Sequence, residues 1–324
     1  MHHSQIYRAS AITTLLAVLS AGNPALGEVD EKDQDLPLEG KTETLAFSTD
    51  EGSWLSIDIT PDGQTLVFDL LGDLYSLPIR GGTANRITSG LGYDSQPAIS
   101  PDGETITFVS DRDGAWNLWV ANIDGTGARK ISDETQWGII SPEWTPDGDY
   151  IVVTKTAAQT EMTIYHVEGG SGVTLVGAGD NEKFWGVGTA ISPNGKHLYF
   201  ANRVNGNGPI RNFPAAQISR YDMDTGMLEP VTQGEGGAFR PVISPDGDML
   251  VYGTRYETQT GLRVRNLRTG ADRWLAFPVQ RDGQENFRPP SRDLLPGYTF
   301  TPDGKSIVFN AFGEIWQVDV DSSE

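Results

Sequence analysis

Histidine is the side chain most often used for proton transfer and zinc binding near neutral pH, and this 324-residue chain has four. His2 and His3 stand at the extreme N-terminus, which leaves His166 and His197, both within β-rich runs. Two histidines cannot supply a three-histidine zinc site or a binuclear hydrolase centre. The chain has no cysteine, so thiolate metal sites, cysteine nucleophiles and disulfides are excluded. The sequence therefore predicts no metal and no other cofactor.

Paired carboxylates could support glycosidase chemistry. Asp58 and Glu143 are the candidates, because each stands three residues before a proline of one repeated motif. The equivalent residues in the other four copies of the motif are Ala98, Ala190, Val242 and Thr299. No ring of acids forms, and locally hydrogen-bonded or solvated acids are favoured over a catalytic dyad.

Other catalytic patterns fail on single residues. Gly169-Gly170-Ser171-Gly172 has Val173 where a nucleophile elbow needs its last glycine. Gly40-Lys41-Thr42 has Asp35 in place of the first glycine of a phosphate-binding loop. Asp222 and Asp224, two acids in one turn, supply fewer oxygen ligands than a calcium ion needs. We expect no catalytic residues in this chain.

The fold that must position any site is indicated by a repeated four-residue motif. The motif, Ser/Thr-Pro-Asp/Asn-Gly, occurs six times. Proline presets the first turn dihedral, Asp or Asn bonds locally, and glycine adopts the left-handed conformation, so each copy is a hairpin turn. The intervals match a four-stranded propeller blade. The prolines stand at positions 61, 101, 146, 193, 245 and 302.

Strand patterns surround every copy of the turn. A bulky apolar residue precedes each proline by two positions, and third and fourth β-rich runs follow the second. The predicted second strands begin two residues after each motif glycine, at Thr65, Thr105, Tyr150, His197, Met249 and Ser306. The sixth unit lacks a fourth strand, whereas a spare strand, Thr42 to Phe47, precedes the first unit. The sequence predicts an all-β, six-bladed β-propeller of four-stranded antiparallel blades. We expect Thr42 to Phe47 to close the ring against Glu314 to Val318, removing open edges.

Charge and the first segment limit the partners and the location. The formal net charge is −20, which disfavours nucleic acid and anionic membrane surfaces. Arg8, an apolar run from Ala9 to Ala21 and small residues up to Gly27 form a secretory signal pattern. The run is shorter than the roughly 20 residues that a membrane span needs. We expect a signal peptide at 1–27, a linker at 28–40, a propeller at 41–324, and residence in the periplasm after signal removal.

A family resemblance rests on the blades themselves. Ser100-Pro101-Asp102-Gly103 leads into Phe108-Val109-Ser110-Asp111-Arg112-Asp113-Gly114 and Asn117-Leu118-Trp119. These motifs resemble the TolB-like, WD40-like (PD40) propellers. Asp50 to Trp54, Phe68 to Tyr75 and Gly313 to Trp316 are more similar to the propeller ahead of the metal-dependent barrel in large secreted amidohydrolases. The resemblance implies a six-bladed propeller, and it leaves open a fragment, a truncated gene or a stand-alone derivative.

Binding is expected where the inner strands converge on the axis. Five residues before the motif prolines stand Ser56, Gln96, Ser141, Gly188, Arg240 and Gly297. Arg240, the one charge in this set, would anchor a carboxylate or a peptide carbonyl, with Asp94 and Gln96 nearby. With Ser56 and Ser141 they form the five predicted binding residues. A local ion pair of Arg240 is the alternative.

Two functions follow from these observations. The first is an extracytoplasmic module that binds a protein or peptide at the channel mouth without catalysis of its own. The alternative is the accessory propeller of a larger metal-dependent amidohydrolase, whose barrel would be the partner. A self-sufficient propeller enzyme using channel carboxylates is the least favoured.

Overall fold

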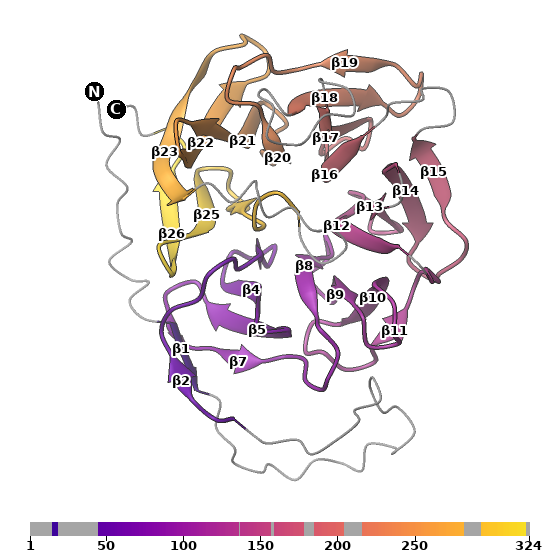
Figure 1. The fold of residues 1–324 in the computed structure, drawn as a ribbon, viewed down its shortest axis with the longest axis vertical. Coiled ribbons are helices and arrows are strands. Elements are labelled where there is room, and N and C mark those ends of the chain that lie inside the picture. Colours follow the sequence, from indigo (N-terminus) through magenta and orange to yellow (C-terminus); the bar gives the residue numbers. More distant parts are fainter. Residues whose placement is uncertain are drawn as a thin grey trace.

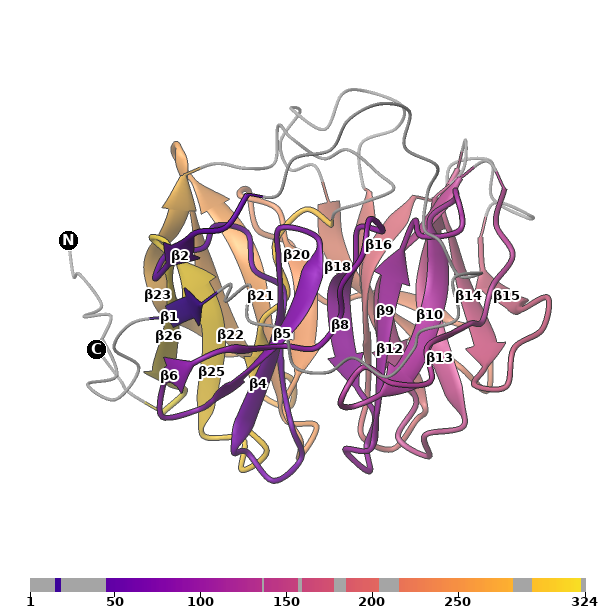
Figure 2. The ribbon, with the colours of Figure 1, turned by 90° about the horizontal axis from the view of Figure 1, so that it is seen from below.

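The protein is a ring of β-sheets around a central axis, shown along the axis in Figure 1 and from the side in Figure 2. This computed structural model describes residues 15–18, 45–135, 137–156, 159–177, 185–203, 216–281 and 293–321. Every regular element in these ranges is a β-strand. The predicted six-bladed β-propeller is confirmed.

Five blades are antiparallel sheets of four strands, in which the first strand is innermost and the fourth outermost. Each second strand begins at the residue that the sequence predicts. The blades are β3(Ile57–Ile59)–β4(Thr65–Leu70)–β5(Asp73–Pro78)–β7(Asn85–Arg86); β8(Ser95–Ile99)–β9(Thr105–Ser110)–β10(Asn117–Asn122)–β11(Arg129–Lys130); β12(Gly138–Trp144)–β13(Tyr150–Thr156)–β14(Glu161–His166)–β15(Val173–Val176); β16(Gly186–Ile191)–β17(His197–Arg203)–β18(Ala216–Asp222)–β19(Leu228–Pro230); and β20(Phe239–Ile243)–β21(Met249–Tyr256)–β22(Gln259–Asn266)–β23(Asp272–Arg281).

The sixth blade differs from the prediction. Its described strands are β24(Thr299–Phe300), β25(Ser306–Ala311) and β26(Glu314–Asp319), and β26 pairs only with β25 among the described residues. Of the predicted closing strand, 42–44 lie outside the described residues and 45–47 belong to no strand. The short strand β2(Ser48–Thr49) instead pairs with β1(Leu15–Val18), which also pairs with β6(Gly82–Thr83). The predicted register against Glu314 to Val318 is therefore wrong for the described part.

The ring is nevertheless closed between the first and sixth blades. Gly52 N–H donates to the Gly313 carbonyl at 2.9 Å, and Ile57 N–H donates to the Gly297 carbonyl at 3.1 Å. The Asn310 amide bridges the same junction, because Oδ1 accepts from Leu55 N–H at 3.3 Å and Nδ2 donates to the Gly52 carbonyl at 2.9 Å. Backbone hydrogen bonds of irregular segments and the buried Asn310 amide thus close the ring, in place of the predicted strand.

The six motif turns have the predicted chemistry. In the second blade the Ser100 hydroxyl donates to Asp102 Oδ1 at 2.5 Å, and Gly103 N–H donates to the Ser100 carbonyl at 2.8 Å. Gly103 has φ +76°, in the left-handed region that favours glycine. A Cβ on Gly103 would lie 3.0 Å from Pro61 Cδ of the first blade, and a Cβ on Gly63 would lie 3.5 Å from Pro302 Cδ of the sixth. The turns therefore pack around the ring, each proline against the next glycine.

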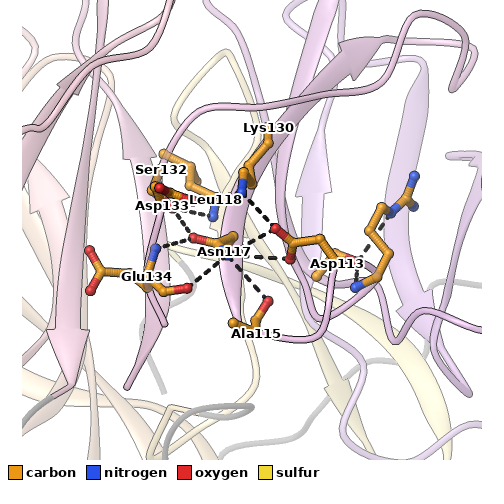
Figure 3. A network of polar contacts seen from close by, with 10 residues as sticks. Asp113, Ala115, Asn117, Leu118, Lys130, Ser132, Asp133 and Glu134 are labelled. Carbon is orange, nitrogen blue, oxygen red and sulfur yellow. Dashed lines mark hydrogen bonds and ion pairs between the residues drawn. The ribbon is translucent and has the colours of Figure 1, made fainter. Parts of the chain in front are cut away.

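Buried hydroxyls and amides join the outer strands within a blade. Figure 3 shows Asn117 at the centre of such a network, with Nδ2 donating to Asp113 and to the Glu134 carbonyl. Asn117 Oδ1 accepts from the Ser132 hydroxyl at 2.8 Å, and Ser132 Oγ accepts from Leu118 N–H at 2.9 Å. The Asp-Arg-Asp-Gly segment that carries the family resemblance is thus a structural turn.

Candidate functional site

The residues five positions before the motif prolines lie at a bend of the inner strands. The register shifts there in blades two to five, and Gln96, Ser141 and Arg240 have φ of 54°, 54° and 48°. A bulge of this kind re-aims side chains next to the axis. The sequence placed these residues at one mouth of the channel but did not reveal the bulge.

Arg240 is held by an acid that sequence analysis did not identify. Its NH1 lies 2.8 Å from Asp293 Oδ2, and the Asp293 side chain is only 1% exposed. The Ser141 hydroxyl donates to the same Asp293 oxygen at 2.5 Å, while Leu294 N–H donates to Asp293 Oδ1 at 2.5 Å. The Tyr298 hydroxyl also donates to the Arg240 carbonyl. The local ion pair anticipated as the alternative is therefore present.

Further hydrogen bonds extend this network around the axis. Ser141 N–H donates to Gln96 Oε1 at 2.9 Å. Gln96 N–H donates to Asp69 Oδ2 at 2.9 Å, and Ser56 N–H donates to Asp69 Oδ1 at 2.7 Å. Ser56, Gln96 and Ser141 are all buried. Four of the five predicted binding residues thus belong to one connected network, which we call the axial network: Ser56, Asp69, Gln96, Ser141, Arg240 and Asp293.

The fifth predicted residue, Asp94, does not join the axial network. Its carboxylate lies 2.6 Å from Arg112 NH2, and the Arg112 guanidinium lies over the rings of Phe108 and Trp119. Asp94 is 1% exposed. It contributes to the packing of the second blade, and its predicted contact with a partner stays a prediction, as does that of the other four.

Below the axial network lies a cavity of about 280 Å³ that all six blades line. Its wall includes the six equivalent side chains three positions before the motif prolines, namely Asp58, Ala98, Glu143, Ala190, Val242 and Thr299. Arg240 and Tyr298 form its end next to the axial network. The equivalence that the sequence indicated for Asp58 and Glu143 is confirmed.

Asp58 and Glu143 differ in how well they are satisfied. Asp58 Oδ2 accepts from Ile99 N–H at 2.7 Å and Oδ1 from Ile59 N–H at 2.8 Å, yet burial raises its pKa to about 6. Burial, followed by repulsion from Asp58, raises the Glu143 pKa to about 8, and the Arg240 charge opposes both shifts. Glu143 is therefore a neutral acid at pH 7, able to donate as well as accept a hydrogen bond.

Metal-binding groups are sparse near this cavity. His166 lies on β14 and His197 on β17, and neither lines the cavity. Within the described ranges, no three histidine or acidic side chains gather as potential metal ligands. The same ranges contain no helix long and apolar enough to cross a membrane.

The comparison with known families decides the affiliation of the chain. Residues 41–215 match the TolB beta propeller domain, PD40. The chain belongs to this family. A structure of putative TolB from Agrobacterium tumefaciens superposes on this propeller with a TM-score of 0.64 at 18% identity, over 84% of this chain and 91% of that chain.

Two curated relatives of the PD40 chain are longer than the region they share with it. An uncharacterized protein of Agrobacterium fabrum is 30% identical over 172 residues, which is 49% of this chain and 56% of the relative. Tricorn protease homolog 1 of Streptomyces coelicolor is 26% identical over 268 residues, which is 80% of this chain and 23% of the relative. The chain thus spans less than two thirds of both.

Sequence analysis of this PD40 propeller missed Asp69 and Asp293 as parts of the axial network. Asp69 stood within a family motif, but nothing in its position on the second strand indicated that its two oxygens would accept from amides of two blades, at Ser56 and Gln96. Asp293 belongs to no repeat. The available signal was the 57-residue interval between Pro245 and Pro302, the longest between motif prolines, which contains it.

Proposed function

We propose that this chain is an extracytoplasmic propeller that binds a peptide segment in its axial cavity and performs no catalysis of its own. The observation that carries the proposal is the cavity lined by all six blades, which holds the Asp58 and Glu143 carboxyls and ends at Arg240. Concave sites with mostly apolar walls and a few convergent polar groups are the usual binding sites of proteins.

The ionisation of the cavity favours a peptide over a simple cation. A neutral Glu143 at pH 7 can donate to a peptide carbonyl, and the better-bonded Asp58 can accept from a peptide amide. Arg240 adds a cationic group at the inner end, suited to a carbonyl or carboxylate. Apolar side chains, including Ile59 and Val242, line the wall beside these polar groups.

The test fills the cavity. Peptides selected from a random library against the wild-type chain are titrated into Val242→Phe, which places a ring at the position equivalent to Asp58 and Glu143. The matched control is Val173→Phe, at a 65% exposed position on β15. Thermal unfolding of both variants shows whether the ring remains folded.

We expect Val242→Phe to weaken binding at least tenfold and Val173→Phe to leave it unchanged. Glu143→Leu offers a smaller change in the same cavity, and we expect it to weaken binding severalfold because leucine has neither a hydrogen-bond donor nor an acceptor. Peptides that bind both phenylalanine variants equally well would show that the cavity is not the site.

A second candidate is an accessory propeller of a larger hydrolase. It is supported by the tricorn protease homolog, in which the shared region is 23% of the relative, and by the resemblance to the amidohydrolase propeller. Sequencing the gene beyond the Glu324 codon tests it. An in-frame barrel with a His-x-His motif selects this candidate, and an immediate stop codon eliminates a fused barrel.

Extracytoplasmic residence is part of the proposal and rests on the signal pattern in residues 1–27. Fractionation of expressing bacteria and N-terminal sequencing of the mature chain test it. Cleavage after Gly27 with recovery from the periplasm is expected. An intact N-terminus in the cytoplasm would contradict it.

A further inference from the structure

A second cavity, of about 700 Å³, lies on the outer side of the ring between blades four and five. One wall is the chain between β19 and β20, including Gln233 to Gly236, and the other is the face of β21, β22 and β23. The strands of both blades are seen in Figure 1. We call this cavity the outer groove, and no residue of the axial cavity lines it.

The outer groove differs in charge from the rest of the chain. Arg255, Arg263 and Arg265 line it together with two acids, Glu235 and Asp272, which gives the lining a formal charge of +1. The chain as a whole carries −20. A cationic groove on an acidic protein is a local attractor for anions, since the remaining surface repels them.

Strand register builds the cationic wall. Arg263 pairs with Tyr252 on β21 and with Trp274 on β23, so the three side chains form one row across the blade. Asp272 is the anchor of this row, because its carboxylate accepts from Arg263 Nε at 2.6 Å and from the Tyr252 hydroxyl at 2.7 Å. The Arg263 guanidinium lies 4.9 Å over the Trp274 ring. Arg263 is thereby fixed in place.

Arg265 is held much less firmly than Arg263. Within the described residues its ion pair is a single 3.5 Å contact from NH1 to Asp272 Oδ2, at the outer limit of a hydrogen bond. Its side chain is 28% exposed. Asp272 neutralises mainly the guanidinium of Arg263. The Arg265 guanidinium can therefore offer its charge and its planar set of N–H donors to a ligand in the groove.

The Trp274 ring of the groove is not free for stacking of a sugar. A sugar ring would need an open aromatic face, but the Trp274 ring is engaged by Arg263, by Phe277 at 4.8 Å and by the edge of Tyr256 at 6.3 Å. The opposite wall contains Gly234 and Gly236, whose main chain is held in place: Gly234 N–H donates to Gln217 Oε1 at 3.2 Å, and the Gly236 carbonyl accepts from Arg255 N–H at 3.2 Å. A Cβ on Gly234 would meet no atom within 4 Å.

We propose that the outer groove is a binding site for an acidic peptide segment, with Arg265 as the group that pairs with its carboxylate. The site is separate from the axial cavity and does not depend on its function. Hexaglutamate is the probe, titrated by calorimetry at low and at raised salt. Hexaglutamine, inorganic phosphate and an oligogalacturonate of equal charge are the comparison ligands.

The decisive variant is Arg265→Gln, and Arg268→Gln is its control. Arg268 is 73% exposed, pairs with Asp248 and does not line the groove, so the control removes the same charge elsewhere. We expect Arg265→Gln to weaken hexaglutamate binding about tenfold, as for one charge-assisted hydrogen bond, and Arg268→Gln to change it less than twofold. Added salt should weaken binding to the wild type.

Several results would overturn the proposal. They are no measurable binding of hexaglutamate to the folded wild type, equal losses in the two arginine variants, and equal binding of hexaglutamine. Phosphate that displaces hexaglutamate with the same affinity would indicate a simple anion site. Tighter, Arg265-dependent binding of the oligogalacturonate would indicate a saccharide site. Loss of hexaglutamate binding in Val242→Phe would place the peptide in the axial cavity instead.

Discussion

The axis of the propeller has two levels, built two residues apart on the same inner strands. At the upper level, five residues before the motif prolines, the axial network joins Arg240, Asp293 and Ser141 with short hydrogen bonds. At the lower level, three residues before the prolines, Asp58 and Glu143 face a cavity, and burial raises the pKa of both. The upper level is paired within the protein, whereas at the lower level Asp58 is hydrogen-bonded and Glu143 faces the cavity.

The difference separates a structural role from a binding role. Buried polar groups that are fully hydrogen-bonded stabilise a unique arrangement, whereas poorly satisfied ones gain most from a ligand. Sequence analysis chose the upper level for binding, because Arg240 is its one charge. The geometry moves the proposed contact to the lower level, with Arg240 at the boundary between the two.

The largest effect should come from breaking the upper level. Asp293→Ala leaves the Arg240 guanidinium without its buried counter-charge, and the loss of one member of a buried pair costs about 3–5 kcal/mol. Urea unfolding measures the change. Asp248→Ala, which breaks the surface pair with Arg268, should cost less than about 1 kcal/mol. Similar costs for both variants would remove the structural role assigned to the axial network.

The stability of the protein should depend on pH through Glu143 at the lower level. Glu143 keeps its proton up to about pH 8 when folded but would lose it near 4.5 when unfolded, so the unfolded state binds fewer protons between these values. Stability therefore falls as pH rises through this window. Glu143→Gln should be more stable than wild type by about 2–4 kcal/mol at pH 9, by the linkage of 1.36 kcal/mol per pH unit, and equal to it at pH 4.

The control for this prediction is Glu168→Gln, whose side chain is 77% exposed. It should leave the pH profile of stability unchanged. Part of the decline up to about pH 6 should persist in Glu143→Gln, because Asp58 has a raised pKa of its own. Parallel profiles for wild type and Glu143→Gln would mean that the lower level is well solvated.

A milder change at the upper level is Ser141→Ala. It removes the hydroxyl that donates to Asp293 Oδ2 at 2.5 Å but leaves the ion pair to Arg240 in place. We expect a loss of roughly 1–2 kcal/mol in unfolding free energy, typical of a hydrogen bond to a charged group. A loss as large as that of Asp293→Ala would show that the hydroxyl, and not the ion pair, holds the network together.

The smallest effect is expected far from the axis, in the repeated turns. Asp102→Ala removes the acceptor of the Ser100 hydroxyl and of Glu104 N–H. Because the turn is exposed, the loss should be roughly 0.5 kcal/mol, measured by the same urea unfolding. A loss above that of Ser141→Ala would mean that the turns, and not the axis, dominate stability.

The parts that sequence analysis predicted are those fixed by local chemistry. The Ser100-Pro101-Asp102-Gly103 turn and its five copies place the second strands at the predicted starting residues, because proline, hydroxyl and glycine determine the reversal within four residues. Equivalence of Asp58 and Glu143 follows from the same spacing. Blade number and the equivalence of these two acids could therefore be predicted from the chain, whereas the cavity between them was not.

The missed parts depend on contacts between distant segments. The junction of blades one and six uses Asn310 and Gly52, which no pattern relates, and the strand expected from Thr42 to Phe47 does not supply it in the described residues. Asp293 reaches Arg240 and Ser141 from a segment without repeat character. Local patterns cannot show such pairs, since only the closed ring brings them together.

The most direct test of the two-level account is an NMR titration of the Glu143 carboxyl in the wild type, without and with a selected peptide. The account predicts a pKa of about 8 in the free protein and a clear shift of the carboxyl resonance when peptide binds. A pKa near the ordinary value of 4.5, with a resonance that does not respond to peptide, would contradict it.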